Sequence, residues 1–246
     1  MASFRVLVTS DFMCPFCYIG KRHLEKALSE LQADTSFPLL QNAAKDVIIE
    51  FRPFQLAPAL SSPIPVYQYI NKVYGSSYAS AEEFQLKSNV TPMLDKLGLK
   101  MHVDRYMVNT FLAHRVTCTV QAKYGHNVAN EFVDKVLEST FGKGEDISRA
   151  DVLAQCLVNA CASLNTLTEN HVDVGPKNET EALDLVVAQS EEYDSMTREL
   201  LTDARKQRIR GVPYFQISSI SGPNQVVQFS GAQPVEIMKD AFRSVA

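Results

Sequence analysis

Two cysteines in the segment Cys14-Pro15-Phe16-Cys17 lie where an apolar, β-branched run gives way to helix-forming sequence. Residues 4–9 have the pattern of a strand, and residues 15–33 have the pattern of a helix. The first N–H groups of a helix have no intrahelical partner, and the macrodipole puts partial positive charge there. A thiolate at Cys14 would therefore be stabilised, its pKa would fall, and it would act as a nucleophile at neutral pH.

The spacing of these two cysteines favours a dithiol–disulfide couple. Pro15 suits the first helical turn, because it lacks an N–H and its φ is already helical. Cys17 follows one turn after Cys14 on the same face of the helix. It can attack a mixed disulfide formed at Cys14 or close an internal disulfide with it. We therefore predict that Cys14 is the nucleophile and Cys17 the resolving thiol.

The other three cysteines bear on alternative interpretations of the motif. Structural zinc requires four ligands, and Cys118, Cys156 and Cys161 form no second C-x-x-C, so we predict no metal site. Two inert thiols at the motif are the other alternative, because free cysteine is often a core residue. A five-residue spacing on a helix places the Cα atoms of Cys156 and Cys161 roughly 8–9 Å apart, which exceeds the reach of a disulfide. We expect buried free thiols at all three positions.

Composition narrows the class of protein and its compartment. The chain has 246 residues, 46% of them hydrophobic, which is enough for a sizeable globular core. The net charge of −4 does not favour nucleic acid as a partner, and no apolar run is long enough to cross a membrane. The N-terminal residues show no secretory signal. We therefore expect a cytoplasmic protein, in which a C-x-x-C is more often catalytic than structural.

The order of the remaining patterns predicts the fold class. Residues 47–54 form a second apolar run, and strand, helix and strand in this order make a parallel βαβ unit. A helical pattern then extends over residues 66–208, and residues 211–217 and 225–229 are typical of a hairpin that precedes a last helix from Pro234. We expect an α/β fold in which residues 1–65 and 209–246 form one discontinuous domain and residues 66–208 an all-helical insertion domain. The helices expected in the insertion span residues 80–98, 108–124, 127–141 and 148–164, with a long last helix from 178 or 180 to 208.

Two distant motifs together resemble a known fold. The C-x-x-C after the first strand and Gly211-Val212-Pro213 before the third resemble the thioredoxin fold, in which a cis proline faces the dithiol. The similarity extends over nearly the whole chain. The motifs that carry it are Asp11-x-x-Cys14-Pro15-x-Cys17-Tyr18-x-Gly20-Lys21-Arg22, Phe51-Arg52-Pro53-Phe54-Gln55-Leu56, Asn109-Thr110-x-x-Ala113-His114-Arg115, Gly211-Val212-Pro213-Tyr214-Phe215 and Ser230-Gly231-Ala232-Gln233. In these motifs the chain resembles the DsbA family with a helical insertion, in particular its FrnE-like branch.

The resemblance implies a thiol–disulfide oxidoreductase that acts on protein or small-molecule disulfides and dithiols. It implies no bound cofactor, with glutathione as co-substrate or a reducing partner protein, and no nucleic acid or membrane partner. By the same resemblance, Pro213 is cis and the Val212 backbone receives an extended substrate segment as an added strand. Pro15, Phe16, Asn109 and His114 are the other residues expected to contact the substrate. For His114 the alternative is a hydrogen-bonded histidine in the seam between the two domains.

Related proteins in the same superfamily leave other functions open. The 2-hydroxychromene-2-carboxylate isomerases and kappa-class glutathione transferases resemble this chain in layout, but typically have Ser in place of Cys14 and lack the second Cys. Retention of both thiols favours redox chemistry over a glutathione-dependent isomerase or transferase acting on a hydrophobic aromatic substrate. A non-enzymatic binding module, with a cleft between the domains, is a third hypothesis. Two features have more than one interpretation. Asp11 is the acceptor of the Cys17 proton, a helix-start partner or a solvated carboxylate, and residues 205–210 are either a solvated helix end or an anion-binding rim.

Overall fold

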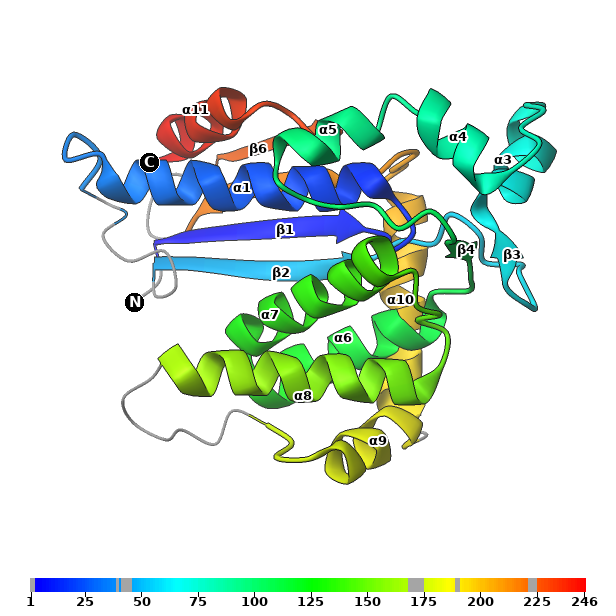
Figure 1. Cartoon of the computed structure of the whole chain (residues 1–246). Coiled ribbons are helices and arrows are strands. Elements are labelled where there is room, and N and C mark those ends of the chain that lie inside the picture. Colours follow the sequence, from blue (N-terminus) through cyan, green and yellow to red (C-terminus); the bar gives the residue numbers. More distant parts are fainter. Residues whose placement is uncertain (1–2, 39, 41–45, 168–174, 189–190, 221–224) are drawn as a thin grey trace.

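A four-stranded sheet with the strand order β2-β1-β5-β6 forms the centre of the molecule in the computed structural model (Figure 1). The model describes residues 3–38, 40, 46–167, 175–188, 191–220 and 225–246. Strand β1 (Phe4–Ser10) pairs in parallel with β2 (Val47–Pro53) and antiparallel with β5 (Tyr214–Ser219), which pairs antiparallel with β6 (Val226–Ser230). The parallel βαβ unit and the closing hairpin are therefore confirmed, and the turn residues 221–224 lie outside the described residues.

Two helices pack together on this sheet. Helix α1 (Pro15–Ala33) has the bounds expected from the sequence, and α11 (Val235–Val245) follows the last strand. Alternation in β1 buries Phe4, Val6 and Val8, and the ring of Phe4 meets that of Phe242 from α11 edge-on, with centroids 5.4 Å apart. The strand pattern and the amphipathic helices thus produce one apolar core.

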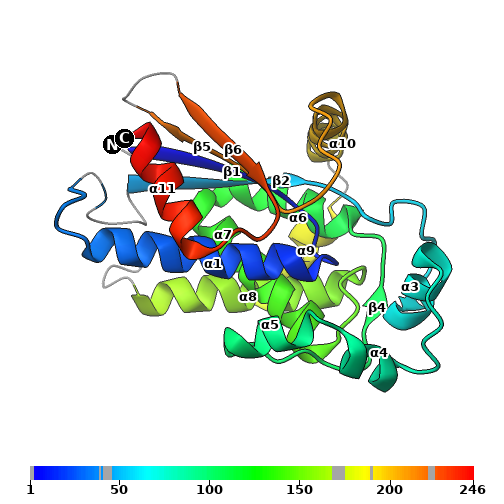
Figure 2. The ribbon, with the colours of Figure 1, turned by 90° about the horizontal axis from the view of Figure 1, so that it is seen from above.

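In the described residues of the insertion, the regular structure is helical except for one short strand. Its helices α6, α7 and α10 pack against β2, the edge strand at the far end of the sheet from β6 (Figures 1 and 2). Strand β4 (Tyr106–Met107) pairs antiparallel with β3 (Ile64–Pro65), outside the main sheet. The helices are α3 (Val66–Tyr74), α4 (Ala81–Lys87), α5 (Thr91–Lys96), α6 (Phe111–Tyr124), α7 (His126–Leu137), the π-helix η1 (Glu138–Lys143), α8 (Ala150–Leu167), α9 (Glu179–Val187) and α10 (Glu191–Lys206).

The structure corrects the helix bounds within the insertion. The helix expected over 80–98 is two helices, because Ser88 is extended and Pro92 opens a new first turn in α5. The long helix expected from 178 to 208 is also two, because the backbone leaves helical geometry at Ala188. A side chain caps the first helix of each split pair: Ser80 accepts a hydrogen bond from the Glu83 N–H before α4, and Asn178 accepts one from the Glu181 N–H before α9.

Three further features complete this description. The helix expected over 127–141 is α7 followed by η1, and the helix expected from 108 starts at Phe111. The domain boundaries at residues 65 and 209 stay a prediction. In the part of the chain that the structure describes, no helix has both the length and the apolar content needed to cross a membrane.

Candidate active site

Cys14 caps the first turn of α1, at the end of the sheet where β1 finishes. Its backbone is extended, with φ −89° and ψ 111°, and Pro15 is the first helical residue. The Cys14 N–H donates to the Asp11 carbonyl at 3.1 Å, and the Cys17 N–H donates to the Cys14 carbonyl at 3.0 Å. These two turns place both sulfur atoms at the helix terminus, as the sequence predicts.

The two thiols lie in the same buried environment, but their pKa values are shifted in opposite directions. Both are free and buried, with 5% of Cys14 and 4% of Cys17 exposed. The pKa of Cys14 is lowered, because the Cys17 thiol donates a hydrogen bond to it, and the N–H groups of Cys17 and Phe16 add to this effect. Burial raises the pKa of Cys17 well above its usual value, and its hydrogen bond to Cys14 raises it further. The arrangement therefore stabilises a thiolate at Cys14 and a thiol at Cys17.

The segment Val212-Pro213 lies directly against the dithiol. The peptide bond between these residues is cis, which is the isomer that the resemblance implies. The Cys14 thiol donates to the Val212 carbonyl with 3.5 Å between sulfur and oxygen. Pro213 also approaches α1, because a Cβ added to Gly20 would lie 2.9 Å from its Cγ and 3.2 Å from the Phe215 ring. A residue without a side chain at position 20 thus lets the helix and the Pro213 loop pack together.

The carboxylate of Asp11 joins two loops around the thiols. One oxygen accepts the Met13 N–H at 3.3 Å, and the other accepts the Leu56 N–H at 2.6 Å. The backbone N–H of Asp11 donates to the Cys17 sulfur at 3.5 Å. With 1% of its surface exposed, Asp11 is not a solvated residue. It is a helix-start partner that also lies beside the resolving thiol.

His114 is buried behind this carboxylate. Its Nε2 donates to the Phe54 carbonyl at 2.8 Å and lies 3.8 Å from an Asp11 oxygen. Its ring packs on Phe12, with centroids 4.9 Å apart. Only 4% of the residue is exposed, which fits the hydrogen-bonded seam histidine better than a direct substrate contact.

Asn109 lies at the edge of an open pocket. Its side chain accepts hydrogen bonds from Gln55 at 2.8 Å and from the Phe111 N–H at 2.9 Å, and it donates to the Pro58 carbonyl at 3.0 Å. These bonds hold the loop that follows β2. The pocket, of about 710 Å³, is lined by Gln55, Pro58, Asn109, Phe111, Arg198 and Arg205, among others.

The predicted site residues thus divide into two groups. Cys14, Cys17, Val212 and Pro213 are in direct proximity, and Phe16, which is 38% exposed, and the half-buried Pro15 border Cys14 along the chain. The structure places Asn109 and His114 in hydrogen-bond networks of the adjoining loops. Whether these two residues contact a substrate stays a prediction. Of the basic segment 205–210, Arg205 lines the pocket beside Asn109.

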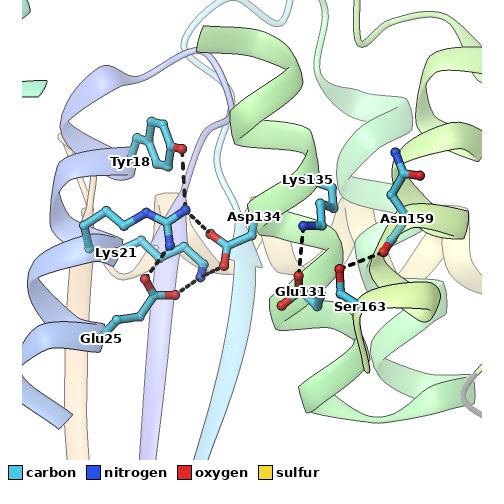
Figure 3. Close-up of polar contacts among 9 residues, drawn as sticks. Tyr18, Lys21, Glu25, Glu131, Asp134, Lys135, Asn159 and Ser163 are labelled. Carbon is cyan, nitrogen blue, oxygen red and sulfur yellow. Dashed lines mark hydrogen bonds and ion pairs between the residues drawn. The ribbon is translucent and has the colours of Figure 1, made fainter. Parts of the chain in front are cut away.

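Sequence reasoning missed an ion cluster that ties the active-site helix to the insertion (Figure 3). Lys21, 3% exposed, pairs with Glu25 and with Asp134 of α7, the latter at 2.9 Å. Arg22 pairs with the same two carboxylates, at 2.6 and 3.0 Å. The Lys21–Glu25 spacing of four residues was a visible signal. The second carboxylate of the cluster, Asp134, comes from a distant helix that sequence spacing does not connect to α1.

Comparisons with known proteins agree with this geometry. A family model described as the DSBA-like thioredoxin domain matches residues 5–243. The uncharacterised protein YwbO of Bacillus subtilis strain 168 is 25% identical over 150 residues, or 61% of this chain. The match spans only 62% of the length of that curated relative, which is less than two thirds.

Two solved structures share the architecture. A probable DsbA oxidoreductase from Streptomyces coelicolor has a TM-score of 0.72 at 23% identity, covering 98% of this chain and 89% of its own. The cytosolic disulfide reductase DsbM from Pseudomonas aeruginosa has a TM-score of 0.55 at 11% identity, covering 98% and 97%. At these identities the likeness establishes the fold.

Proposed function

The chain belongs to the DSBA-like thioredoxin domain family, and from that premise we propose that it is a thiol–disulfide oxidoreductase. One observation supports this proposal above the others. Cys14, with its lowered pKa, contacts both the resolving thiol of Cys17 and the carbonyl before the cis proline. A metal site or an inert core pair has no need of this asymmetry between the two thiols.

The proposed reaction transfers two electrons from the dithiol to a disulfide. The Cys14 thiolate attacks one substrate sulfur, a mixed disulfide forms, and the other substrate sulfur leaves as a thiolate and takes a proton. Cys17 then loses its proton and attacks the Cys14 sulfur, which releases the second substrate thiol and leaves an internal disulfide. Glutathione or a reducing partner protein in the cytoplasm would restore the dithiol. In the reverse direction the disulfide form oxidises a substrate dithiol.

The raised pKa of Cys17 makes its proton the difficult one to remove. The backbone N–H of Asp11 donates to the Cys17 sulfur, and the charge of its buried carboxylate helps to raise the Cys17 pKa, so we assign this carboxylate as the proton acceptor in the resolving step. Its two backbone hydrogen bonds hold it in place. His114, 3.8 Å from Asp11, would support the carboxylate rather than touch the substrate.

The Val212 carbonyl is the proposed anchor for the substrate backbone. This carbonyl accepts a hydrogen bond from the Cys14 thiol while the thiol is protonated. Once Cys14 ionises, the sulfur has no hydrogen to donate, and the carbonyl is available to an N–H of an extended substrate. Both a polypeptide disulfide and a peptide-like small disulfide carry such an N–H.

A glutathione-dependent isomerase or transferase is the second candidate function. The pocket beside Asn109 supports it, because Arg198 and Arg205 supply cationic groups and Phe111 an aromatic one. The Arg198 guanidinium lies 4.6 Å from the Phe111 ring centre. Such a pocket would hold the carboxylates of a bound thiol peptide. In this case activity would survive Cys17→Ser and would depend strictly on glutathione.

The reduction potential of the Cys14–Cys17 couple tests the proposal. Mass spectrometry after equilibration in glutathione redox buffers would show an internal disulfide that forms at a defined potential. A value near about −120 mV indicates an oxidant and one near about −270 mV a reductant. If one glutathione on Cys14 were the sole product, the oxidoreductase proposal would give way to the isomerase or transferase.

A further inference from the structure

The two edges of the central sheet differ in how far other elements cover them. Helices α6, α7 and α10 cover strand β2, and Glu50 and Arg52 form an ion pair on it at 2.6 Å. Strand β6 is the opposite edge, and within the described residues its main contacts are with β5 and α11 (Figure 2). An uncovered edge presents unpaired N–H and C=O groups to any available strand.

Strand β6 also lacks the usual protection of such an edge. Residues 225–230 include no charged side chain, and Val226 is 53% exposed. Natural edge strands commonly carry a lysine, a proline or an inward-pointing charge that prevents pairing with another chain. On α11, Lys239 pairs with Glu30 of α1 and Arg243 with Asp34, the residue directly after α1. Ile237, 47% exposed, therefore lies on the opposite flank of that helix, toward the free edge.

Hydrogen bonding in the hairpin defines which groups face outward. The Gly231 N–H donates to the Pro213 carbonyl at 2.8 Å, so this pair lies on the hydrogen-bonded phase of the ladder. Hydrogen-bonded and non-hydrogen-bonded pairs alternate along an antiparallel ladder, so the N–H and C=O groups of Phe229 and Val227 also point toward β5. The N–H and C=O groups of Val226, Gln228 and Ser230 consequently point away from β5, toward the free edge.

This pattern is complementary to itself. A two-fold axis at Gln228 pairs Gln228 with Gln228 of a second copy, and Val226 with Ser230 of that copy, so each outward N–H meets a C=O. The Ser230 carbonyl already accepts a hydrogen bond from the Gln233 side chain at 2.8 Å, and its second lone pair is the one that the Val226 N–H of the other copy would use. On the face toward α11, Val227 then lies opposite Phe229 of the other chain, and Phe229 opposite Val227. Aromatic and β-branched cross-strand pairs are favourable in antiparallel sheets. We propose that β6 pairs antiparallel with β6 of a second copy of this chain, which joins the two four-stranded sheets into one.

A second copy fits this edge better than a peptide from another protein. A closed two-fold contact uses the same patch twice, and each requirement here is met by the strand itself. The paired strands would lie at the opposite edge from the inserted helices. The Cys14 sites of the two copies would lie toward opposite ends of the joined sheet, because β6 runs antiparallel to its partner.

The test uses charge at the centre of the contact. Size-exclusion chromatography with light scattering would follow wild type, Gln228→Glu and Gln228→Lys over a wide range of protein concentration. Like charges facing each other across the axis should weaken each variant's self-association at least about tenfold. An equimolar mixture of the two variants should recover association, because Glu then faces Lys.

Gln216→Glu is the matched control, since Gln216 lies beside Gln228 on the inner strand β5 and shares a 3.4 Å hydrogen bond with it. It should leave association unchanged, and circular dichroism should show that all variants are folded. A wild type that is monomeric at every concentration overturns the proposal. So does a dimer that ignores the charge at position 228, or one that Gln216→Glu weakens equally.

Discussion

The chain holds two pairs of buried, reduced cysteines on helices, and they differ in nearly every chemical respect. Cys14 and Cys17 lie at the start of α1, three residues apart, and the pKa of Cys14 is lowered. Cys156 and Cys161 lie in the middle of α8, five residues apart, and burial raises the pKa of Cys156 to about 11. Burial is similar in both pairs, with 2% to 5% of each residue exposed, so exposure does not explain the difference.

Position along the helix does explain it. At the start of α1 the Cys17 thiol donates a hydrogen bond to the Cys14 sulfur, which is the largest cause of the lowered Cys14 pKa, and the backbone N–H groups of Cys17 and Phe16 at the helix start add to it. In the middle of α8 the backbone N–H groups are used within the helix, and the hydrogen bond of Cys156 with Ser139 does not offset its desolvation. In this chain the pair at the helix start has donors for a thiolate, from the Cys17 thiol and from the backbone, whereas Cys156 lacks enough of them to offset its burial.

Removal of the nucleophile is the change with the largest expected effect. Cys14→Ser should lower the single-turnover rate with a disulfide-linked model peptide at least about a thousandfold, because a neutral hydroxyl replaces a thiolate. Mass spectrometry of the mixed disulfide and released thiol measures this rate. Cys156→Ala, in the other pair, is the matched control. Full activity in Cys14→Ser would contradict the assignment of the nucleophile.

The resolving step distinguishes the role of Cys17 from that of Cys14. Cys17→Ser should still attack the peptide through Cys14 but should accumulate the mixed disulfide, because no thiol is left to release it. Non-reducing mass spectrometry would detect the adduct, which a reductant should reverse. Rapid turnover without an adduct would show that an external thiol resolves the intermediate, as in the glutathione-dependent alternative.

The close approach of α1 to Pro213 makes Gly20 the next position to change. In Gly20→Ala the new Cβ would lie 2.9 Å from the rigid Pro213 ring, so the cis-proline loop must shift from the thiols. We expect a loss of about 1–3 kcal/mol in the free energy of unfolding, with a slower reaction at Cys14. Denaturant unfolding and the peptide assay measure the two effects. Gly142→Ala is the control, because its Cβ would meet its nearest neighbour at 3.8 Å. A variant as stable and active as wild type would show that the loop adapts.

Acidity gives a smaller but more specific test. The largest cause of the lowered Cys14 pKa is the hydrogen bond from the Cys17 side chain. Cys17→Ala removes this donor, so the Cys14 thiolate loses stabilisation and its pKa should rise. Cys17→Ser keeps a hydroxyl donor and should raise the pKa less. The pH profile of iodoacetamide alkylation at Cys14 reports both values. An unchanged midpoint in Cys17→Ala would mean that the backbone N–H groups alone hold the pKa down.

The sequence predicted the features that depend on local patterns and missed those that depend on contacts between distant segments. The bounds of α1, the parallel βαβ unit and the position of both thiols depend on local patterns, and all are as expected. The long-range partners of the site do not follow from spacing. Phe141, whose ring stacks on Tyr18 with centroids 5.7 Å apart, reaches it from the π-helix η1. An extra residue per turn is not visible in a hydrophobic pattern. The breaks at Ser88 and Ala188 are hidden in the same way, because the helical pattern of apolar residues continues across both of them.

The second cysteine pair provides the smallest expected effect. Cys156→Ala removes a buried thiol from the packing of α8 against its neighbours, which should cost about 1 kcal/mol of unfolding free energy. Activity with the peptide should stay within about twofold of wild type, because a thiol whose pKa is about 11 is almost fully protonated at neutral pH. Peptide mapping after brief alkylation of the folded protein should accordingly find label on Cys14 and little on Cys156. Extensive labelling of Cys156, or a loss of activity larger than the loss of stability explains, would mean that the helix terminus is not what distinguishes the two pairs.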